Sequence, residues 1–145
     1  MELSDLYSAR LLEIAGNATD PGRLASPDGT AERRARLCGS TIAVDVALEN
    51  QVISAYGHKV RACALGQTSA AVVAKVAVGT PVAEIRRVRD EMVRMLKEQG
   101  PPPAGARWDD LKYLEPVRDF PARHDSTLLV FEALCDAIGQ AEGRK

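Results

Sequence analysis

The stretch LCGSTIAVDVALENQVISAYGHKVRACALG, residues 37–66, contains the pattern that decides the fold. Apolar and polar side chains alternate over Thr41–Glu49, which predicts a strand with one buried face. A second strand is predicted over Val52–Arg61, and the polar residues Asn50 and Gln51 between the two runs predict a tight turn. The stretch therefore predicts a β-hairpin, with a possible bulge at Gly57 in its second strand.

Cysteines flank this hairpin on both sides. Cys38 precedes the first strand, and Cys63 follows the second, where an alanine-rich helix is predicted over residues 64–78. Because a hairpin folds its ends back on each other, we expect both thiols at one end of a sheet. A helix N-terminus favours the thiolate form, which binds metals and carries sulfur. Each cysteine is equally consistent with a small buried side chain at a strand end.

The remaining sequence predicts three more helices and an edge strand. The first helix is expected over residues 4–15 with Ser4 as cap. The second runs to Gly100, with Thr80 as cap and Pro81 at its first position. The third runs from Arg123 to Gly139, and the edge strand is expected over Ala31–Leu37. Cys135 lies on the apolar face of the last helix, which favours a core position.

Composition excludes several classes of protein. The chain has 145 residues, 46% of them hydrophobic, so we expect a single domain over residues 1–145. Its net charge of −1 argues against a general role on nucleic acids or membrane surfaces, although a local basic patch is compatible with it. There is no apolar run of membrane-spanning length, and the acidic start predicts no signal peptide. Three cysteines, an odd number, favour free thiols in a reducing, cytoplasmic setting.

A third group of candidate ligands stands at the start of the last helix, in His124-Asp125-Ser126. His124 and Asp125 carry side chains that bind metals, and either is a candidate to complete a site with the two thiols. Asp125 or Ser126 is equally suited to cap the helix. His58 lies an odd number of residues before Cys63, which predicts opposite faces of the strand and no Cys–His pair.

Four motifs occur in an informative order. They are Asn17-Ala18-Thr19-Asp20-Pro21-Gly22, Leu37-Cys38-Gly39-Ser40, the run from Ala62 to Ala70, and Phe120-Pro121-Ala122-Arg123. Together they resemble the IscU/SufU/NifU-N family of iron–sulfur cluster assembly scaffolds. The chain has a proline-bearing insert before the last motif, and in this feature it is similar to the SufU branch of the family.

The resemblance implies an α+β fold, a three-stranded antiparallel sheet with helices packed mainly on one face. It also implies an iron–sulfur cluster or a zinc ion as cofactor, bound by Cys38 and Cys63, and a cysteine desulfurase and other assembly proteins as partners. Neither nucleic acid nor membrane is expected. The ligand set is degenerate, because Ser126 stands where the family has its third cysteine and Ser40 where it has an aspartate.

Three hypotheses about function follow. The first is a scaffold, not an enzyme, in which Cys38 and Cys63, with His124 or Asp125, hold iron, a cluster or zinc. The second is a metal-free interaction or regulatory module of the assembly machinery. The third is a sulfur-transfer enzyme with Cys63 as nucleophile, for which the sequence offers no obvious general base.

Overall fold

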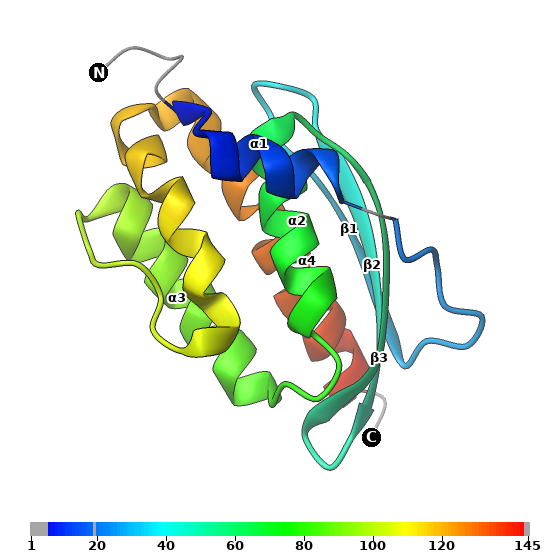
Figure 1. Ribbon diagram of the computed structural model, residues 1–145. Helices are drawn as coiled ribbons and strands as arrows, with labels where there is room; N and C mark the ends of the chain where they lie inside the picture. The colour runs from blue at the N-terminus through cyan, green and yellow to red at the C-terminus, as the bar shows by residue number, and fades with distance from the viewer. Residues whose placement is uncertain (1–5, 19, 144–145) are drawn as a thin grey trace.

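The structure of the chain is a computed structural model that describes residues 6–18 and 20–143. A three-stranded antiparallel sheet, ordered β1-β2-β3, has the α-helices on one of its faces (Figure 1). The predicted fold class is confirmed. The elements are α1 (Ala9–Gly16), β1 (Gly29–Arg34), β2 (Thr41–Glu49), β3 (Val52–Arg61), α2 (Ala64–Val76), α3 (Val82–Lys97), the 3₁₀ helices η2 (Ala106–Asp119) and η3 (Pro121–Arg123), and α4 (His124–Gly143).

The hairpin has the bounds that the sequence predicts. β2 and β3 pair antiparallel, and their turn places Asn50 and Gln51 at φ values of +53° and +64°. Two left-handed residues are what a two-residue hairpin turn requires, and Asn tolerates that conformation better than most residues. β1 differs from its prediction, because the chain leaves the sheet at Ala35 to form a turn and the strand begins earlier, at Gly29.

The core lies between the sheet and the helices. Ile42, Val44 and Val46 point from β2 into it and are almost completely buried. α4 makes the closest contact with the sheet: a Cβ on Gly29 would lie 2.1 Å from the Ala137 carbonyl oxygen. The alanine-rich α2 lies between α1 and α4 and also contacts β3 (Figure 1).

One predicted cap differs from the structure, and the other lies outside the described residues. Ser8 caps α1, since its hydroxyl accepts a hydrogen bond from the Leu11 amide at 3.1 Å, whereas the predicted cap Ser4 lies outside the described residues. Thr80 does not cap α3, because its hydroxyl donates back to the Val76 carbonyl at 2.6 Å. The residue at the N-cap of α3 is Pro81.

The predicted bulge at Gly57 is also wrong. The irregularity in the hairpin falls between Ala47 and Leu48 instead. Gly57 has another role, because the chain after α1 passes directly over it, and a Cβ there would lie 2.4 Å from the Gly22 carbonyl oxygen. This close passage fixes the loop against the sheet face that the helices leave open.

Candidate functional site

Cys38 is presented by the tight turn that joins β1 to β2. The Ala35 amide donates to the Ser40 carbonyl at 2.8 Å, and the Gly39 amide donates to the Ala35 carbonyl at 3.1 Å. Gly39 adopts a φ of +71°, which favours glycine because no Cβ is present to clash. The turn leaves Cys38 exposed, with its Sγ 3.0 Å from the Oγ of the buried Ser40.

Cys63 occupies the N-cap of α2, as predicted, but its side chain makes no capping hydrogen bond. Its Sγ lies 3.7 Å from the Oγ of Ser126 in the first turn of α4. Gly66 allows this approach, because a Cβ there would lie 3.1 Å from the Ser126 carbonyl oxygen. Gly66, three residues after Cys63, therefore leaves room for the start of α4 to lie close to the thiol.

Electrostatics distinguish Cys38 from an ordinary surface thiol. Partial burial raises the pKa of Cys38, but hydrogen bonds with Ser40 and Ser126 and the positive charge of Arg123 together lower the pKa below its usual value. A lowered pKa increases the fraction of thiolate at neutral pH, and thiolate is the form that binds metals and attacks sulfur.

The site therefore contains two thiols and two hydroxyls. The Ser126 Oγ lies 3.7 Å from the Cys63 Sγ, and Ser126 contributes to lowering the pKa of Cys38, so both thiols lie near Ser126 at one end of the sheet, as the hairpin predicts. The serines stand at the two positions that the family resemblance singled out. Arg123 is the contribution that the sequence reasoning missed; its signal was a position three residues before Ser126, which places it on the same side of the helix start.

His124 and Asp125 lie differently from Ser126. His124 is buried, and its Nε2 contacts the carbonyl oxygens of Val117 and Arg118 at 3.0 and 3.2 Å, so this nitrogen donates. Asp125 is exposed and lines a separate hollow of about 290 Å³. Within residues 6–18 and 20–143, no three His, Cys, Asp or Glu side chains stand close enough together to hold a metal ion. The ligand roles of His124 and Asp125 stay predictions.

Cys135 and His58 have the surroundings of residues that support the fold. Cys135 is half-buried against the core, and burial raises the pKa of its thiol to about 11. Such a thiol stays protonated at neutral pH and is a poor nucleophile. His58 is buried on the inner face of β3, where its Nδ1 lies 2.7 Å from the Tyr56 hydroxyl.

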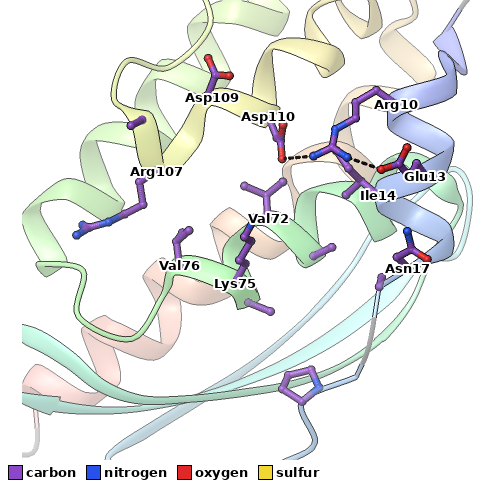
Figure 2. Close-up of a pocket in the computed structure, with 15 residues that line it drawn as sticks. Arg10, Glu13, Ile14, Asn17, Val72, Lys75, Val76, Arg107, Asp109 and Asp110 are labelled. Atoms are coloured by element: carbon purple, nitrogen blue, oxygen red, sulfur yellow. Dashed lines mark hydrogen bonds and ion pairs between the residues drawn. The ribbon is translucent and has the colours of Figure 1, made fainter.

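A hollow of about 720 Å³ lies away from the thiols, between α1, α2 and η2 (Figure 2). Arg10 reaches across it to Asp110 at 3.2 Å and also pairs with Glu13 at 2.6 Å. Neither Cys38 nor Cys63 lines this hollow, so it has no direct connection to the predicted chemistry.

Comparison with solved structures decides the family. The chain is 48% identical to a nitrogen-fixing NifU-like protein (N-terminal) from Brucella abortus, with 99% of each chain covered and a TM-score of 0.94. This chain belongs to the NifU-like N-terminal family. Family models and curated proteins give no match to the sequence.

Two more distant structures share the fold of this NifU-like chain. One, from Fervidobacterium islandicum, is described as an iron–sulfur cluster assembly scaffold protein for the SUF system; it is 16% identical, with a TM-score of 0.83. The other, a hypothetical protein, is 21% identical, with a TM-score of 0.80. In both comparisons 94% of this chain and 99% of the other are covered. At these identities the likeness establishes the NifU-like fold and not the chemistry.

Proposed function

We propose that this chain is an iron–sulfur cluster assembly scaffold that holds iron, a growing cluster or zinc through Cys38 and Cys63. The sulfur would come from a cysteine desulfurase. The observation that carries the proposal is the meeting of both thiols at Ser126, from segments 25 residues apart in sequence. Membership of the NifU-like family and the description of the Fervidobacterium protein support it.

The sulfur atoms of Cys38 and Cys63 are the right type of ligand for this cargo, but two ligands are fewer than it needs. Thiolates are the preferred ligands of iron–sulfur clusters and are common ligands of zinc, and the lowered pKa of Cys38 assists metal binding at neutral pH. Serine hydroxyls at positions 40 and 126 are weak ligands by comparison. One chain therefore offers half of the four ligands that such a site takes, and sulfide, solvent or another protein would supply the rest.

Completion of the site by His124 or Asp125 would need a rearrangement. His124 would give up its Nε2 hydrogen bonds to two carbonyl oxygens of η2, unless it bound through its other ring nitrogen. Asp125 would turn from the hollow that it lines with Arg33 and Lys97. A site completed from outside the chain requires neither change, and this favours an open site that hands its cargo on.

The second candidate is a metal-free interaction or regulatory module. The observation that favours it is the pair of serines, because Ser40 and Ser126 occupy both positions where the resemblance implies stronger ligands. The third hypothesis, sulfur transfer with Cys63 as nucleophile, receives less support. The described contact of the Cys63 sulfur is the Ser126 hydroxyl, which is not a base at neutral pH.

Metal loading separates these functions. The chain is purified without oxygen, incubated with ferrous iron and sulfide or with zinc, and freed of unbound ions. Bound iron, sulfide and zinc are then measured, together with the visible absorption of the cluster. We expect wild-type protein to bind cargo, and Cys38→Ala and Cys63→Ala each to lose most of it.

Cys135→Ala is the matched control, because it removes the third thiol of the chain away from the site. Its loading should equal that of wild type. If wild type binds no metal, or if all three variants load equally well, the scaffold proposal fails and the interaction module takes its place.

A further inference from the structure

The sheet face opposite the helices is covered over only part of its length. The loop after α1 crosses it at Gly57, and Arg23 from this loop donates to Asp45 at 2.6 and 2.9 Å. Asp45 is buried by this contact. The covered part therefore centres on the row in which Thr30, Asp45 and Gly57 pair across the strands.

Two further cross-strand rows lie beyond the loop, toward the thiols. Because Ile42 and Val44 point into the core, the alternate residues Thr41 and Ala43 face outward. The strand register pairs Glu32, Ala43 and Lys59 in one row and Arg34, Thr41 and Arg61 in the next. These rows line a hollow of about 480 Å³, which we call the basic hollow.

Positive charge dominates the lining of the basic hollow. Arg34, Lys59 and Arg61 are exposed, and among the described residues none of them forms an ion pair with a carboxylate. The other two arginines at its edge are already paired, Arg23 with Asp45 and Arg33 with Asp136. Glu32 is the acidic residue of the lining, so an excess of positive charge gathers here on a chain whose net charge is −1.

The basic hollow lies next to the site. Arg34 ends β1 immediately before the Cys38 turn, and its Nη2 is 4.0 Å from the position of a Cβ on Gly39. Arg61 ends β3 two residues before Cys63. Leu37, in the same turn as Cys38, is 73% exposed and offers an apolar contact at the edge of this surface. A molecule seated in the hollow would therefore border the turn that carries Cys38.

We propose that the basic hollow docks an acidic segment of a partner protein and so positions that partner at Cys38. The inference rests on the proposed function for what the partner then exchanges there. Charge complementarity selects acidic side chains, and exposed Leu37 beside them suits a protein better than a polyanion. Nucleic acid is a poorer fit, because none of the described residues that line the hollow is aromatic and able to stack on bases.

Binding of a fluorescein-labelled oligo-glutamate peptide, followed by fluorescence anisotropy at low ionic strength, tests the charge. Low salt is needed because exposed charges are screened over about 10 Å at 0.1 M. We expect Arg34→Gln/Lys59→Gln/Arg61→Gln to bind the peptide about tenfold more weakly than wild type, as three modest surface ion pairs would give. The matched control is Arg86→Gln/Arg87→Gln/Arg94→Gln on α3, which removes the same number of charges from residues that do not line the basic hollow and should bind like wild type.

A thiol-exchange experiment tests the position of the docked segment. Cys63→Ser/Cys135→Ser leaves Cys38 as the one thiol of the chain. The peptide carries a cysteine joined by a disulfide to thionitrobenzoate. The Cys38 thiolate attacks the peptide sulfur, forms the new disulfide and releases coloured thionitrobenzoate. We expect the oligo-glutamate peptide to react several-fold faster than a glycine–serine peptide, and this advantage to disappear in the hollow variant but not in the α3 control.

Three results would overturn the proposal: equal binding losses in the two triple variants, no rate advantage for the glutamate peptide, or a larger loss for single-stranded DNA than for the peptide in the hollow variant. Cluster loading with inorganic sulfide needs no partner, and the hollow variant should load iron like wild type. A wild-type chain that binds the peptide but no iron would contradict the proposed function and leave the docking surface in place.

Discussion

Substitution of Ser126 by cysteine offers a quantitative test of the site. The Ser126 Oγ lies 3.7 Å from the Cys63 Sγ and also interacts with Cys38. Zinc–sulfur bonds of about 2.3 Å at tetrahedral angles place two sulfurs about 3.8 Å apart. A sulfur at position 126 would thus stand at about the separation from Cys63 that a shared zinc ion needs.

The expected gain in affinity follows from the ligand count. Structural zinc sites with four ligands bind with about 10–16 kcal/mol, or about 3 kcal/mol per ligand. Ser126→Cys weakens the hydrogen bond that the hydroxyl donates to the Arg123 carbonyl at 3.3 Å, at a cost of about 1 kcal/mol. The net gain is about 2 kcal/mol, which corresponds to about 30-fold tighter zinc binding.

The assay is competition for zinc against a coloured chelator, without oxygen, at neutral pH. Ser126→Ala removes the hydroxyl without adding a ligand and should bind zinc no more tightly than wild type. Ser126→Cys placed in a Cys63→Ala chain has its neighbouring thiol removed and should lose the gain. Both controls separate a new ligand from a general effect of substitution at a buried position.

Unchanged zinc affinity in Ser126→Cys would refute the reasoning. It would mean that position 126 does not face the ion, although its hydroxyl lies 3.7 Å from the Cys63 sulfur. An equal gain in the chain that lacks Cys63 would be just as damaging, because it would show that the zinc is bound without the thiol pair.

Three other outcomes follow from the same contacts. Four thiolates hold a two-iron cluster, and Cys38 and Cys63 supply two per chain. Reconstitution should therefore give a dimer that shares one cluster, with about one iron per chain. Iron analysis measures the stoichiometry, and light scattering measures the dimer. Arg123→Gln should raise the pKa of Cys38 and move its alkylation-rate curve to higher pH in a chain whose other cysteines are serine; an unmoved curve would exclude the charge effect. Hydrogen bonds from Arg23, partly offset by burial, lower the pKa of Asp45 from 3.8 to about 2. Ionised Asp45 therefore stabilises the fold above pH 4, and this contribution is lost as the pH falls toward 2. Asp45→Asn should therefore reduce the free energy of unfolding by about 2 kcal/mol at pH 7 and by much less at pH 2, which chemical denaturation at the two values measures.

Local pattern was sufficient for the hairpin. The alternation over Thr41–Glu49 and the polar turn at Asn50 and Gln51 predicted both strands with the bounds that the structure has. It was insufficient for Gly57, which looked like a bulge. The reason for that glycine is the carbonyl of Gly22, a residue 35 positions away in sequence, and no local pattern encodes this contact.

The candidate site was also predicted only in part by the sequence. The order of motifs placed Cys38, Cys63 and Ser126 together, and the structure brings these side chains to one end of the sheet. It did not separate His124 and Asp125 from that group, because three adjacent residues look equally available in sequence. On a helix, successive side chains point in directions about 100° apart, so Ser126 meets the thiols while His124 contacts η2.

The sequence by itself determined the hairpin and the thiols at its ends. These are properties of residue type and of spacing within one short segment. Only the tertiary structure decided that Arg123 acts on Cys38, that Gly66 admits the start of α4, and that one end of the outer sheet face stays open beside Arg34 and Arg61. Each of these depends on which distant segments come into contact, and that is set by how the helices and the loop pack on the sheet.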